Sequence, residues 1–253
     1  MRSAMRWANS RVGHICLRGV LLFAGLLLAC VDTSWAVVSL DTVIHHEGGS
    51  SPKTVSGTIA ANSDRVLIAY VHMEDGGTSV SGLGVTWNGV SMTAIGSSYS
   101  FSTGFTLYAF GLIAPDTGTH DLVLSWSGGG VNWTVVTAMA FYGADQTTAW
   151  QNRTTASGTS AAPSISVTSS NGNMATAAYM HTGSADTFVE VNGTEAYASE
   201  PWETLYRAST GGSTTISGTT TSSWTWGMLG VDVVQVGGGA SAETFGFRKR
   251  RMQ

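Results

Sequence analysis

The sequence predicts an all-β protein built as an antiparallel β-sandwich, and three observations predict it. Residues from about 50 to 236 are rich in Ser, Thr, Gly and Val and alternate between apolar and polar positions. Turn residues recur at the spacing expected of a sandwich or barrel, which gives about a dozen strands. No segment beyond Val37 has a helical apolar period. We expect a jelly-roll-like arrangement of these strands.

Individual strands and turns can be placed along the chain. Three apolar or alternating runs are typical of strands: Arg65–Met73, Phe105–Ile113 and Asp121–Trp126. The segment Gly84–Ile95 holds Asn88-Gly89 between two such runs, which is the strongest short signal for a β-hairpin. The segment Pro115–His120 reads as another turn.

Short motifs recur in the same order in two parts of the chain. The sequence AYVH at Ala69–His72 returns as AYMH at Ala178–His181, and TLY at Thr106–Tyr108 returns at Thr204–Tyr206. Repeats of this kind suggest two related β units. We therefore predict a single sandwich domain over 54–236, made of pseudo-repeated halves at 54–149 and 163–236 that share one core. Residues 150–162 are expected to be the linker between them.

The N-terminal segment has the pattern of a secretory signal peptide. Basic residues precede the uncharged run Gly19–Ala29, which is about half the length of a membrane-spanning helix. The sequence SWA predicts cleavage after Ala36, so that residues 1–36 are removed and 37–53 form an N-terminal extension. The sequence LLAC offers the alternative of a lipoprotein with Cys30 lipidated. Either alternative predicts a secreted or cell-surface protein without a transmembrane segment in the mature chain.

Charge and cysteine content exclude several classes of function. Between Val37 and Val236 there are four basic and fourteen acidic residues, a balance that argues against nucleic acid as a partner. Cys16 and Cys30 both lie in the segment before Ala36, so cleavage there leaves no thiol for disulfides or metal ligation. Residues 237–253 form a Gly-rich spacer and a basic tail, which we interpret as a solvated terminus.

Several longer segments together resemble a known type of module. They include GVTWNGVSMT at Gly84–Thr93 and FYGADQTTAW at Phe141–Trp150, with WTWGMLGVDVVQV at the end of the body. Over Val55–Val236 the chain resembles a β-sandwich module that recurs in bacterial secreted and surface proteins and in some phage proteins. The resemblance implies a sandwich fold, and it brings no catalytic residues with it.

The apolar run LIAYVHMEDGG ends in three potential ligands, His72, Glu74 and Asp75. Because the histidine recurs in the second half, we interpret it as architectural, with its ring hydrogen-bonded to a carbonyl near a strand end. A calcium or zinc site formed by the three residues is the alternative, although their spacing matches no established metal motif. We predict neither a cofactor nor a bound metal.

Two tryptophans are candidates for ligand binding. Trp150 and Trp202 fall in expected loops beside amides and a carboxylate, as a sugar-binding surface requires. A loop tryptophan that packs down onto the end of a sandwich would show the same pattern, and this is the interpretation that we favour. Four others lie in strand-like runs and are expected in the core or on a sheet face: Trp126, Trp133, Trp224 and Trp226.

The sequence contains no nucleophile elbow, phosphate loop or zinc-protease motif, and we predict that the protein is not an enzyme. Clustered carboxylates leave a glycoside hydrolase as the least favoured function. These carboxylates are Glu190, Glu195, Glu200 and Glu203. The favoured function is a non-catalytic module for adhesion, attachment or extracellular matrix structure, with glycans or surface proteins as partners. The alternative is a lectin-like carbohydrate-binding module, assisted by calcium.

Overall fold

The computed structural model describes residues 37–237 except 79, 184 and 185, and it confirms the predicted all-β sandwich fold. The described residues form antiparallel strands and no helix. The strands are β1 (Ser39–Gly48), β2 (Lys53–Ile59), β3 (Val66–Glu74), β4 (Ser81–Trp87), β5 (Val90–Ser91), β6 (Thr93–Ala94), β7 (Tyr99–Ser102), β8 (Phe105–Ile113), β9 (Gly118–Ser127), β10 (Trp133–Tyr142), β11 (Trp150–Ser160), β12 (Ser164–Thr168), β13 (Met174–His181), β14 (Val189–Asn192), β15 (Thr194–Ser199), β16 (Trp202–Ala208), β17 (Ser213–Thr219) and β18 (Trp224–Val233).

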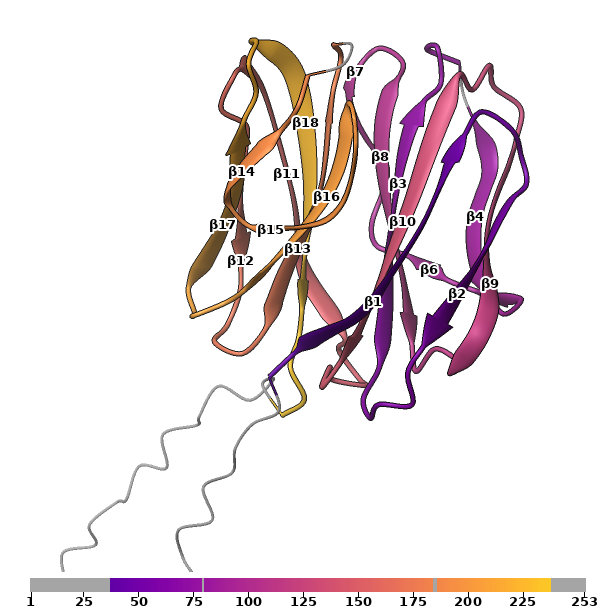
Figure 1. Ribbon diagram of the computed structural model, residues 1–253, viewed down its shortest axis with the longest axis vertical. Coiled ribbons are helices and arrows are strands. Elements are labelled where there is room, and N and C mark those ends of the chain that lie inside the picture. The colour runs from indigo at the N-terminus through magenta and orange to yellow at the C-terminus, as the bar shows by residue number, and fades with distance from the viewer. Residues whose placement is uncertain (1–36, 79, 184–185, 238–253) are drawn as a thin grey trace, which may run out of the picture. The chain divides into compact units, whose positions relative to one another are not determined.

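These strands make four sheets, which pack face to face in two pairs (Figure 1). Inner sheet 1 has the order β1-β10-β3-β8-β6, with β7 also paired to β8, and it packs on outer sheet 1, β2-β9-β4-β5. Inner sheet 2 has the order β11-β18-β13-β16-β15 and packs on outer sheet 2, β12-β17-β14. A third apolar cluster joins the two inner sheets, where the Tyr70 hydroxyl lies 2.8 Å from the Thr176 hydroxyl.

The layer order explains the different sequence patterns of the strands. An inner sheet is covered on both faces, so its central strands are apolar without alternation. Every residue of β3 except Glu74 is buried, and every residue of β13 is buried. Strands of the outer sheets have one face in water, and β12 accordingly alternates between exposed and buried positions.

The two pairs of sheets share one strand order, but the repeated motifs face different layers. In each pair, the first strand of the inner sheet neighbours the last strand, followed by the third. Tyr70 of the AYVH motif lies in the cluster between the inner sheets, whereas Tyr179 of AYMH lies between inner and outer sheet 2. The jelly-roll class and the internal duplication therefore stay predictions.

Two predicted boundaries are wrong. Residues 150–162 were expected to be a linker, but Trp150–Ser160 is strand β11, hydrogen-bonded along β18. The expected N-terminal extension contains β1, which pairs with β10 over nearly its whole length. Both segments are polar because they are half-exposed strands at sheet edges. The predicted signal peptide, Cys30 and the basic tail lie outside the described residues.

Candidate functional site

The histidine of the LIAYVHMEDGG run, His72, lies between the two inner sheets. His72 is fully buried on β3, and its Nε2 lies 3.0 Å from the carbonyl oxygen of Glu203 on β16. Burial lowers the pKa of His72 to about 4, although hydrogen bonding to the Glu203 carbonyl opposes the shift. A neutral histidine in this place ties inner sheet 1 to inner sheet 2.

The three potential ligands His72, Glu74 and Asp75 do not converge on one point. Glu74 lies opposite Trp133 in the β3–β10 register, so it shares the His72 face of inner sheet 1. Asp75 follows the strand and lines a hollow beside β7 and β8. In the part of the chain that the structure describes, no three His, Cys, Asp or Glu side chains are placed to hold a metal ion. The alternative of a joint calcium or zinc site is therefore wrong for these three residues.

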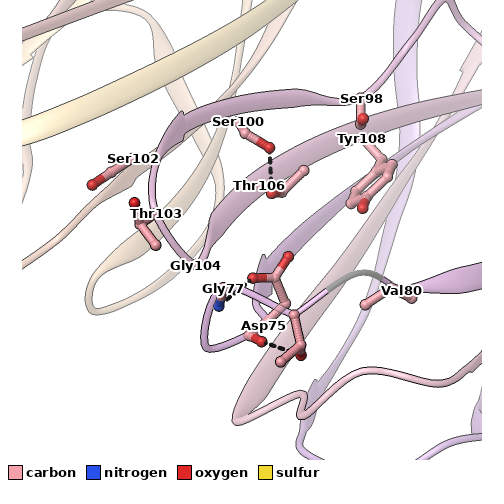
Figure 2. Close-up of a pocket in the computed structure, with 11 residues that line it drawn as sticks. Asp75, Gly77, Val80, Ser98, Ser100, Ser102, Thr103, Gly104, Thr106 and Tyr108 are labelled. Atoms are coloured by element: carbon pink, nitrogen blue, oxygen red, sulfur yellow. Dashed lines mark hydrogen bonds between the residues drawn. The ribbon is translucent and has the colours of Figure 1, made fainter.

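A polar hollow lies beside Asp75 (Figure 2). Its volume is 370 Å³, at the small end of the range of about 300–1,000 Å³ that ligand sites occupy. Hydroxyls from β7, β8 and the turn between them line one side, and the loop after β3 lines the other. The hydroxyl-bearing residues are Thr78, Ser98, Ser100, Ser102, Thr103, Thr106 and Tyr108.

The loop that carries Asp75 is held in place by its own hydrogen bonds. The Asp75 Oδ1 accepts a hydrogen bond from the Gly77 amide at 2.9 Å, and the Asp75 carbonyl accepts one from the Thr78 hydroxyl at 2.7 Å. Gly77 has φ of 79°, a left-handed conformation that favours glycine. The Asp75 amide also donates to the carbonyl of Gly104 in the β7–β8 turn. The carboxylate is thus fixed at the wall of the hollow.

The opposite wall presents donors and acceptors together with one aromatic ring. The hydroxyls of Ser100 and Thr106 are 2.8 Å apart, and Tyr108 stands next to them on β8 (Figure 2). Partial burial raises the pKa of Tyr108, and the nearby Asp75 charge raises it further. The phenol therefore stays protonated and can donate a hydrogen bond. Hydroxyls, a carboxylate and an aromatic ring are the groups that recognise a polyhydroxylated ligand.

The two predicted ligand-binding tryptophans lie in strands and not in loops. Trp202 begins β16 and is only 7% exposed. Trp150 begins β11 and packs on Gly111 of β8, where an added Cβ would come within 2.7 Å of the indole ring. Both are packing residues of the cluster between the inner sheets. Their expected placement in loops is wrong, whereas the favoured interpretation that they pack against the sandwich agrees with the structure.

Trp133, which the strand pattern assigned to a core or sheet face, is the exposed tryptophan of this region. It begins β10 and is 38% exposed. Its ring is nearly parallel to that of Trp202, with 6.4 Å between the centroids and 10° between the planes. Its position in the sequence does not distinguish it from Trp150 and Trp202, which also begin strands but are packed.

Three of the clustered glutamates, Glu190, Glu195 and Glu203, lie close together where inner sheet 2 packs on outer sheet 2. Glu203 is 4% exposed, and its Oε2 has no hydrogen-bond partner among the described residues. Burial raises the pKa of Glu203 to about 9, and the charge of Glu190 adds to the shift. Glu195 also has a raised pKa, caused first by burial and then by its hydrogen bond to Glu190.

Comparison with family models, with characterised proteins and with solved structures finds no match for this chain. Within residues 37–237, gaps apart, no helix has the length and apolar character to cross a membrane.

Proposed function

We propose that this chain is a non-catalytic β-sandwich module, secreted or held at the cell surface, for adhesion, attachment or matrix structure. Its ligand in this proposal is carbohydrate, held in the hollow beside Asp75. The observation that carries the proposal is the lining of that hollow by hydroxyls, one fixed carboxylate and Tyr108.

The chemistry of the lining supports carbohydrate over an apolar ligand. Sugar hydroxyls donate to a carboxylate and both donate to and accept from Ser and Thr hydroxyls. The Asp75 carboxylate uses Oδ1 to hold the Gly77 amide, and Tyr108 adds a protonated phenol. A secreted module fits the acidic balance of the body and the predicted signal peptide.

A glycan array probed with the purified chain tests this function, first with calcium and then with a chelator. Asp75→Asn keeps an acceptor for the Gly77 amide but removes the charge, so we expect specific binding to weaken about tenfold. The matched control is Asp121→Asn. It removes an exposed carboxylate that accepts a hydrogen bond from Ser56 within outer sheet 1, away from the hollow. Absence of any glycan binding, or equal binding by both variants, contradicts the proposal.

A glycoside hydrolase is the second candidate, favoured by the meeting of Glu190, Glu195 and Glu203. Neighbouring carboxyl groups with raised pKa values, here Glu195 and Glu203, are candidates for acid–base catalysis. Burial of Glu203 argues against access by a substrate. Release of reducing sugar that is lost in Glu195→Gln but kept in Glu200→Gln would replace the attachment function with this one.

A further inference from the structure

We propose a second carbohydrate site at the end of the seam between the inner sheets, where Trp133 forms a stacking platform for a pyranose ring. We define the platform as Trp133, Glu74, Asn132 and Gly49. It lies on the face of inner sheet 1 that is turned toward inner sheet 2, whereas the hollow is bordered by Tyr108 on the other face. The inference does not depend on the function proposed for the hollow.

The indole of Trp133 is held rigidly although it is exposed. Its ring lies parallel to buried Trp202, which backs it from inner sheet 2. Strand β10 pairs on both sides, with β1 and with β3, so the backbone beneath the ring is fixed. A fixed aromatic face loses little conformational entropy when a ligand stacks on it.

Polar groups flank the ring on one side. Glu74 is directly opposite Trp133 in the β3–β10 register, which places the two Cβ atoms about 5 Å apart on the same face. The Asn132 side-chain amide donates to the Glu74 Oε1 at 3.1 Å and so orients the carboxylate. An amide and a carboxylate beside an aromatic face can bond the hydroxyls of a sugar that stacks on the ring.

The chain after β1 comes close to the residue that precedes Trp133. Gly48 pairs with Thr134, and Gly49 follows next to Asn132. The Gly49 backbone approaches Asn132 so closely that an added Cβ would lie 2.7 Å from the Asn132 carbonyl oxygen. A side chain at this position would displace the backbone that leads into Trp133. Trp202 adds a further polar atom to the region, a buried Nε1 without a hydrogen-bond partner among the described residues.

Titration of the full chain with cellohexaose, chitohexaose and mannohexaose tests the platform. Binding is measured by calorimetry, and the indole resonances are followed by NMR in the unsubstituted protein. We expect at least one hexasaccharide to bind and to shift the Trp133 indole signal. Trp133→Ala should weaken that binding tenfold or more, and Trp133→Phe should weaken it less.

The matched control is Trp126→Ala, because Trp126 is a half-buried tryptophan on outer sheet 1 with the Lys53 ammonium 6.0 Å from its ring. It should bind as the unsubstituted chain does. Absence of binding by all three probes overturns the platform, as does binding that leaves the Trp133 signal unmoved. Binding that is lost in Asp75→Asn but unchanged in Trp133→Ala overturns the platform and supports the hollow. Binding that is lost in Trp133→Ala but unchanged in Asp75→Asn supports the platform and not the hollow.

Discussion

His72 couples the stability of the molecule to acid. Its pKa is about 4 when folded, below the value of about 6.5 in an unfolded chain. Between these values only the unfolded chain binds the proton, so the stability that His72 contributes is lost as pH falls from 6.5 to 4. The loss is about 3 kcal/mol.

His72→Gln keeps a donor for the Glu203 carbonyl and cannot titrate. We expect the difference in unfolding free energy between the natural chain and this variant to shrink by that amount from pH 7 to pH 4, measured by urea denaturation. His46→Gln is the control, because His46 hydrogen-bonds only the carbonyl of its neighbour, Glu47. A difference that is constant with pH would show that His72 is not buried in its neutral form.

Glu203 has the opposite dependence. Its pKa is about 9 when folded, against about 4.3 in an unfolded chain. Over this range the folded state holds a proton that the unfolded state releases, so stability is lost as pH rises. We expect Glu203→Gln to remove the loss between pH 6.5 and 9 in urea denaturation, while Glu200→Gln at a nearby exposed position keeps it. An unchanged alkaline loss in Glu203→Gln would contradict the assignment.

At the scale of single elements, the contact of β11 with β8 depends on the absence of a side chain at Gly111. An added Cβ would lie 2.7 Å from the Trp150 ring, so Gly111→Ala overpacks the cluster between the inner sheets. We expect a cost of about 1–3 kcal/mol. Gly84→Ala on β4 is the control, since an added Cβ there has nothing within 4 Å. Equal melting temperatures for the two variants would place Trp150 elsewhere.

Elements were predictable where the local pattern decides the structure. Phe105–Ile113 has the same bounds as β8, and Asn88-Gly89 forms a turn with both residues at positive φ. The strand β11 was missed because an edge strand with one solvent-exposed face can consist largely of Ser, Thr and Gly, which are also the residues of a linker. For the candidate site, Asp75 was found from its residue type. Trp133 was missed because exposure at a strand end depends on how far the facing sheet extends.

At the scale of the whole described chain, the cluster between the inner sheets decides how the two sandwiches unfold. It contains Tyr70, Met139 and Leu229, all fully buried, and it is continuous with both inner sheets. This cluster joins the two halves, and each sandwich also has an apolar core of its own. A large apolar interface between two units couples their unfolding.

We therefore expect one cooperative transition in urea, with coincident midpoints by circular dichroism and by tryptophan fluorescence. Leu122→Ala in the first outer core and Ile216→Ala in the second should each cost about 2–5 kcal/mol and lower the same midpoint, since both side chains are fully buried. Leu229→Ala, between the inner sheets, should either lower that midpoint or divide the transition in two. Two transitions in the unsubstituted chain, each moved by only one of the outer-core variants, would mean that the inner interface is too weak to join the sandwiches.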